Sequence, residues 1–150
     1  MSDAVASDRL YPTRPILAAS VATFRDGRVL VARRARAPSA GLYSLPGGAV
    51  EAGETLHAAA LRELAEEVGI DADIVAFVDH VEPIRFENGR LREHYVIAVF
   101  AARWRSGEAR LGPEADAVAW VEPSEVAELP TTPGLPAIVA AAARLERSLP

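Results

Sequence analysis

Three glutamates in one predicted helix have the spacing that most directly suggests chemistry. Glu63, Glu66 and Glu67 stand at positions i, i+3 and i+4, so their side chains share an arc of about 100° on one helix face. Like charges this close repel one another, and Arg62 alone cannot neutralise all three. Two interpretations stand: a solvated acidic face, or a site at which a hard divalent cation such as Mg²⁺ takes carboxylate oxygens and water as ligands.

A pair of glycines precedes this helix and extends the candidate site. Gly47 offers a backbone carbonyl as a further metal ligand, and Gly48, which has no side chain, lets a substrate approach the backbone closely. Arg33 and Arg34 follow a predicted strand just before these glycines. Because all 16 basic residues are arginines, a phosphate must be held by arginine, backbone N–H groups or a metal. Arg33 and Arg34 are therefore the candidate phosphate ligands, with plain surface charges as the alternative.

The whole segment resembles a known family. From Gly48 to Ile70 the sequence fits G-x5-E-x7-R-E-U-x-E-E-x-G-U, in which U is a bulky aliphatic residue, at every fixed position. This pattern is the signature of the Nudix hydrolases, and the flanking strands and residues 120–126 are also similar to that family. The resemblance implies an α/β/α sandwich with a mixed β-sheet between helices. It also implies hydrolysis of a nucleoside diphosphate linked to another group, which gives a nucleotide and a phosphorylated product.

The resemblance further implies how the acidic helix face works. Glu63, Glu66 and Glu67 are the carboxylates that bind Mg²⁺ or Mn²⁺, and the carbonyl of Gly47 is a further ligand. Either Glu63 or Glu66 is the general base that takes a proton from water, since members of the family differ in which carboxylate does so. A bound cation neutralises the charge of the pyrophosphate and lowers the pKa of a bound water.

Other residues of the motif are structural by the same resemblance. Glu54 and Arg62 form an ion pair that ties the loop to the helix, and Gly69 ends the helix. Beyond the motif, Glu114 stands where some family members supply one more metal ligand or a base. An exposed loop acid is the alternative for Glu114, and Asp116 is the alternative residue for the role.

The segment before the motif bears on the substrate. Residues 41–48, GLYSLPGG, are similar to a segment of ADP-ribose pyrophosphatase-like members, with Tyr43 as the aromatic residue. Residues 33–35 and 103–104 resemble the mutator branch, but residues 129–134 lack the asparagine with which that branch recognises an oxidised purine. We therefore expect ADP-ribose or a nucleotide sugar as substrate. The alternatives are hydrolysis of (oxidised) nucleoside triphosphates, and a non-catalytic nucleotide-sensing domain.

The rest of the sequence predicts the elements that position these residues. Thr55 can cap the acidic helix, and residues 26–27 and 88–89 are typical hairpin turns. The polar residues 82–92 are expected to connect two strands, and residues 46–48 to break an extended segment. The resulting order of elements indicates an α/β or α+β sandwich. Strands are predicted over residues 16–24, 29–32, 42–45, 74–81, 95–102 and 118–121; helical segments over 55–68, 123–126 and 136–149.

Composition narrows the classes of function. With 150 residues we expect a flexible N-terminal arm over residues 1–14 and one domain over residues 15–150. A net charge of −5 argues against binding to nucleic acid or an anionic membrane, and the absence of cysteine excludes disulfides and thiolate metal sites. The start of the chain lacks a signal region, so we expect a cytoplasmic protein with a small-molecule nucleotide substrate. Pairing into a homodimer is left open, and an exposed apolar strand edge would indicate it.

Overall fold

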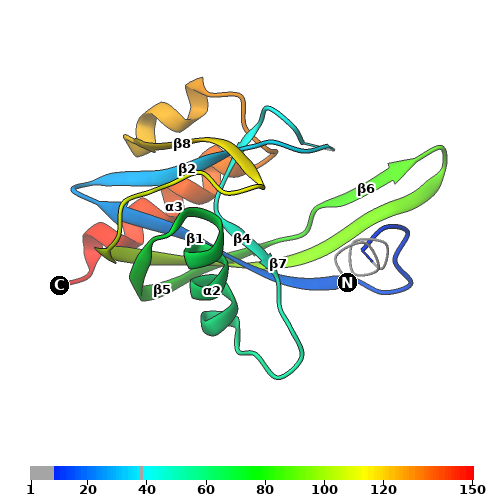
Figure 1. The fold of residues 1–150 in the computed structure, drawn as a ribbon, viewed down its shortest axis with the longest axis horizontal. Coiled ribbons are helices and arrows are strands. Elements are labelled where there is room, and N and C mark those ends of the chain that lie inside the picture. The colour runs from blue at the N-terminus through cyan, green and yellow to red at the C-terminus, as the bar shows by residue number, and fades with distance from the viewer. Residues whose placement is uncertain (1–8, 38) are drawn as a thin grey trace.

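A mixed β-sheet forms the centre of the molecule (Figure 1). The structure is a computed structural model that describes residues 9–37 and 39–150. The strands follow the order β3-β2-β1-β7-β5, with β4 paired to β1, β6 to β7 and β8 to β2. The strands are β1 (Ile16–Arg25), β2 (Arg28–Arg34), β3 (Tyr43–Ser44), β4 (Gly47–Ala49), β5 (Asp71–Val81), β6 (Ile84–Glu87), β7 (Arg90–Ser106) and β8 (Ala115–Val121).

Helices cover both faces of this sheet (Figure 1). Helix α2 (Leu56–Val68) lies on one face and helix α3 (Leu135–Ser148) on the other, and a short 3₁₀ helix, η1 (Pro123–Glu128), precedes α3. The predicted sandwich with a mixed sheet between helices is confirmed. No helix in the described ranges is long and apolar enough to cross a membrane.

Strand β1 organises the sheet because it contacts three other strands. It runs parallel to β7 from Ile16 to Phe24, and it pairs with the antiparallel β2 only at its end. At its start, residues 18–20 pair instead with β4, which brings Gly47 opposite Ser20 and Gly48 opposite Ala19. The glycine pair is thereby fixed beside the central strand.

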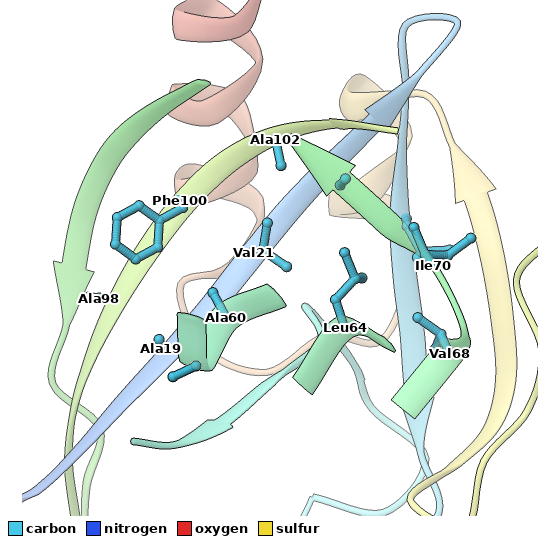
Figure 2. Close-up of a cluster of buried hydrophobic side chains, with 12 residues drawn as sticks. Ala19, Val21, Ala60, Leu64, Val68, Ile70, Ala98, Phe100 and Ala102 are labelled. Carbon is cyan, nitrogen blue, oxygen red and sulfur yellow. The ribbon is translucent and has the colours of Figure 1, made fainter. Parts of the chain in front are cut away.

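Alternation along the central strands supplies the two cores. Successive side chains of a strand point to opposite faces of the sheet. Ala19 and Val21 therefore face α2, where they pack with Leu64 and Phe100 (Figure 2). Their neighbours Ala22 and Phe24 face α3 and pack with Val139 and Ala143.

Both ends of α2 follow from the sequence. The Thr55 hydroxyl accepts a hydrogen bond from the Ala58 N–H at 3.0 Å and caps the first turn. Gly69 adopts φ 73°, a left-handed conformation that glycine takes without strain, and its N–H bonds to the Ala65 carbonyl. The predicted helix boundaries are therefore correct.

Two sequence interpretations were wrong. Residues 82–92 are not merely a connection, because they contain β6 and the start of β7, joined by a turn in which Asn88 and Gly89 have φ 53° and 74°. Their charged side chains pair across the hairpin, Arg85 with Glu93 at 3.2 Å, so a polar composition is compatible with strands. The break expected at residues 46–48 falls at residues 45–46, after β3 ends at Ser44, and residues 47–49 are extended again because they form β4.

The end of the predicted arm contacts the sheet. Residues 1–8 lie outside the described residues. Tyr11 donates its backbone N–H to the Arg92 carbonyl at 2.9 Å, and the guanidinium of Arg90 lies 3.8 Å from the centre of the Tyr11 ring. The segment from Arg9 onwards is thus held against β7.

Candidate active site

Helix α2 brings two of the three glutamates against the glycine pair. Glu63 and Glu67 lie one helical turn apart on the side of α2 that faces β4. A Cβ atom at Gly48 would lie 2.6 Å from the Glu63 carboxylate, so only glycine leaves room for that carboxylate. Glu67 accepts a hydrogen bond from the backbone of Gly47. The fit between β4 and α2 therefore depends on Gly48, whereas Gly47 allows β4 to lie close to β1, because a Cβ atom at Gly47 would lie 2.5 Å from the Ala19 carbonyl oxygen.

The electrostatics around Glu63 and Glu67 favour binding of a cation. Burial raises the pKa of Glu67 to about 8, and the neighbouring charge of Glu63 and the more distant charge of Glu114 add to the rise. A carboxyl group with such a pKa is protonated at pH 7, although the two side chains supply oxygen ligands of the kind that hard divalent cations prefer. The donor set therefore fits a bound divalent cation, which would allow Glu67 to ionise.

Arg62 links the glutamates to the loop before the helix. Its guanidinium donates to Glu54 at 2.6 and 2.9 Å, to Glu63 at 2.9 Å and to the Ala49 carbonyl at 3.2 Å. Glu54 also accepts the backbone N–H of Glu51 at 3.1 Å. The hydrogen bonds from Arg62 hold the pKa of Glu54 at about 2. The loop, β4 and α2 are thus joined through one arginine.

Glu66 is placed differently from the other two glutamates. Its side chain is 61% exposed and accepts a hydrogen bond from the Arg62 guanidinium at 3.3 Å. In the described part of the chain, no three His, Asp or Glu side chains are already grouped closely enough to hold a metal ion. A cation held by Glu63, Glu66 and Glu67 together therefore requires these side chains to move closer together, and Arg62 donates a hydrogen bond to two of them, Glu63 and Glu66.

The loop before β8 reaches the end of α2. Gly112 packs so closely that a Cβ atom there would lie 2.7 Å from the Glu67 carbonyl oxygen. Glu114 follows, and its charge contributes to the raised pKa of Glu67. Asp116 instead accepts a hydrogen bond from Arg33 at 2.6 Å. Of the two acids that the sequence leaves open, Glu114 is therefore the one whose charge acts on an α2 carboxylate.

The arginines at the end of β2 and in the loop that follows it divide into paired and free cations. Arg33 is held by Asp116, whereas the exposed Arg34 has no ion pair or side-chain hydrogen bond with the rest of the described residues. The structure adds Arg36, which sequence reasoning did not single out and which lies 4.0 Å from Glu114. Its only signal in the sequence was its place in the run Arg33-Arg34-Ala35-Arg36.

Comparison with known proteins gives the class. The family model described as NUDIX domain matches residues 14–142, so the chain belongs to the Nudix hydrolases. The members of this family generally use divalent metal ions and act on small-molecule nucleotide substrates. The resemblance seen in the motif is therefore confirmed, and the chain is a Nudix pyrophosphohydrolase.

Individual relatives carry different activities in their names. A crystal structure of the MutT NUDIX hydrolase from Burkholderia pseudomallei has a TM-score of 0.74 and 33% identity, and the match covers 85% of this chain and 98% of that one. An ADP-ribose pyrophosphatase of Methanocaldococcus jannaschii is 32% identical over 108 residues, 71% of this chain and 61% of the relative. An RNA pyrophosphohydrolase of Erythrobacter litoralis is 31% identical over 121 residues, 70% of this chain and 74% of the relative.

Proposed function

We propose that this chain hydrolyses the pyrophosphate of nucleoside diphosphate derivatives in a reaction that depends on Mg²⁺ or Mn²⁺, with ADP-ribose or a nucleotide sugar as substrate. The observation that carries the proposal is the pair Glu63 and Glu67, pressed against Gly47 and Gly48 with the pKa of Glu67 raised to about 8. Such a pair is costly without a counter-ion, and a cation for pyrophosphate chemistry would supply one.

The metal ligands in this proposal are the Glu63, Glu66 and Glu67 carboxylates and the Gly47 carbonyl, joined by Glu114 from the facing loop. When bound, the cation neutralises pyrophosphate charge and lowers the pKa of the attacking water. Glu63 or Glu66 takes the proton of that water. Both candidate bases accept a hydrogen bond from Arg62, and they differ in exposure, since the Glu63 side chain is 17% exposed and the Glu66 side chain 61%.

Arg34 is the proposed phosphate ligand of the chain itself. It is exposed and free of carboxylate partners in the described part of the chain, so its guanidinium is open to two phosphate oxygens. Arg33, which the sequence also suggested, is proposed to brace the loop through Asp116. Gly48 was expected to admit the substrate; its missing side chain makes room for Glu63, and close contact with substrate stays a prediction.

The preference for ADP-ribose or a nucleotide sugar rests on the segment Gly41–Gly48 and on the relative named as an ADP-ribose pyrophosphatase. Residues 129–134 contain no asparagine that could read an oxidised purine. Hydrolysis of a nucleoside triphosphate is the second candidate. The similarity to a MutT structure and to a CTP pyrophosphohydrolase favours it.

A substrate panel tests the proposal. Phosphate-coupled turnover is measured with ADP-ribose, nucleotide sugars, dinucleoside polyphosphates, CTP and oxidised dGTP, with Mg²⁺, with Mn²⁺ and with a chelator. Faster metal-dependent turnover of ADP-ribose or a nucleotide sugar supports the leading proposal. A preference for a triphosphate replaces it with the second candidate. No turnover despite tight metal binding contradicts both and indicates a nucleotide-sensing domain.

A further inference from the structure

The β6–β7 hairpin carries large apolar side chains that nothing in the described structure covers. It consists of β6 and residues 90–94 of β7, and it extends away from the two helices (Figure 1). Ile84 is 50% exposed and Phe86 is 64% exposed. The two residues are two positions apart on one strand, so their side chains lie on the same face. An exposed apolar surface of this kind marks an interaction site.

Strand β6 is also an open edge of the sheet. In the described structure it pairs with β7 and with no other strand. The carbonyl of Pro83 accepts the Tyr95 N–H at 3.0 Å. The register shifts between Arg85 and Phe86, but the extra residue, Arg92, lies on β7, so the backbone groups of alternate residues, 83, 85 and 87, point toward β7. The N–H and carbonyl groups of Ile84 and Phe86 consequently point outward, where they are free to pair with another strand.

The sequence of this edge is complementary to itself in one register. When two copies of β6 pair antiparallel about Phe86, Arg85 of each copy lies opposite Glu87 of the other, and the two Phe86 side chains lie side by side. A centre at Arg85 or at Glu87 would instead oppose like charges. The backbone selects the same register, because Phe86, whose polar groups point outward, then lies opposite Phe86 of the second copy.

We propose that the chain forms a symmetric homodimer through antiparallel pairing of β6 with β6 of a second copy. The two hairpins then form one continuous sheet across a two-fold axis, and Ile84 and Phe86 of both copies form an apolar layer on one face. Arg85 and Glu87 already pair within each hairpin, with Glu93 at 3.2 Å and with Arg92 at 2.8 Å. The contacts between copies join these ion pairs into one network. Because the paired segment is short, the dimer dissociates on dilution.

Sedimentation velocity of the full chain over a range of concentrations tests the surface. The wild type is expected to form dimers as concentration rises, and Phe86→Glu is expected to remain monomeric because two carboxylates would meet at the axis. Leu111→Glu is the matched control: Leu111 is 57% exposed but lies outside the hairpin, so the dimer persists. A wild type that stays monomeric, or a Phe86→Glu variant that still dimerises, overturns the proposal.

Charge exchange tests the register, and it does not depend on the apolar variant. Arg85→Glu alone places two carboxylates opposite each other across the dimer, and Glu87→Arg alone places two guanidinium groups opposite each other, so each variant is expected to be monomeric. In a mixture of the two variants, the glutamates at positions 85 and 87 of one copy face the arginines at positions 87 and 85 of the other. The mixture is therefore expected to form a heterodimer. Circular dichroism melting shows that each variant is folded. Homodimers of either variant alone, or no heterodimer in the mixture, overturn the pairing about Phe86.

Discussion

Two arginines, one on each side of the sheet, each donate hydrogen bonds to several oxygen atoms, but the groups that accept them differ. Arg62, on α2, holds the carboxylates of Glu54, Glu63 and Glu66. Arg103, on β7, donates to the Glu146 carboxylate at 3.0 Å and to carbonyl oxygens of residues 146, 149 and 150 at 2.8–3.0 Å. It thereby satisfies carbonyls that the end of α3 leaves without helical partners.

The two arginine clusters differ in their net charge. Arg103 faces one carboxylate and neutral carbonyls, so its surroundings are balanced. Arg62 donates hydrogen bonds to three carboxylates and lies 4.0 Å from a fourth, that of Glu51, so the region keeps an excess of negative charge. An excess of carboxylates that the fold does not neutralise marks the site, whereas a balanced cluster holds a helix end.

Removing one carboxylate from each arginine cluster should show the largest difference in activity between the two clusters. Glu67→Gln is expected to lower kcat by at least about 100-fold, because it removes a proposed metal ligand, and to leave the chain folded. Glu146→Gln is the matched control on Arg103 and should leave kcat unchanged. Steady-state kinetics with a substrate identified by the panel measure both. Equal kinetics in the two variants would place the metal elsewhere.

Removing the arginines themselves sharpens the comparison. Arg62→Ala frees Glu54, Glu63 and Glu66 from their common partner, so turnover should fall about 10- to 100-fold. Arg103→Ala should lower the melting temperature by about 3–6 °C, as expected for the loss of about 1–2 kcal/mol of hydrogen bonding, with unchanged turnover. If Arg103→Ala lost more activity than the decrease in its folded fraction explains, the Arg103 cluster and the Arg62 cluster would be coupled across the sheet.

Substitution of the arginines near the site should change KM by a smaller factor. Arg34→Ala is expected to raise KM about 10-fold, the effect of one charge-assisted hydrogen bond to phosphate. Arg33→Ala should change KM less, because Arg33 is engaged by Asp116. Initial rates over a range of substrate concentrations measure both values. The reverse order would make Arg33 the phosphate ligand.

The acidity of Glu67 gives a stability difference that depends on pH. Its pKa is about 8 in the folded chain against an ordinary value of 4.5, so between these two pH values the folded state holds a proton that the unfolded state has released. The metal-free protein should therefore lose stability as pH rises from 5 to 8. Calorimetric melting without metal should show this decline, and Glu67→Gln should reduce it. The assigned pKa would be contradicted if the melting temperature of the wild type rose over this pH range and rose by more than that of Glu67→Gln.

The sequence was informative where local chemistry decides the structure. The limits of α2 follow from Thr55 and Gly69, and the contact between Glu54 and Arg62 follows from a motif whose members are eight residues apart. The turn at residues 88–89 was predicted, but the strands on either side of it were missed because their charged residues pair across the hairpin and conceal the pattern of a strand. The different neighbours of Glu114 and Asp116 could not be predicted because they depend on a loop that meets α2 and β2 only in the folded chain.

The proton balance of metal binding tests the central claim most directly. At pH 7 the Glu67 carboxyl group is largely protonated, so a cation held by Glu63 and Glu67 must displace that proton. Titration calorimetry with Mg²⁺ in buffers of different ionisation enthalpy should show release of about one proton per ion bound in the wild type and none in Glu67→Gln. Binding without proton release in the wild type, or equal binding in the variant, would contradict the assignment of this pair as the metal site.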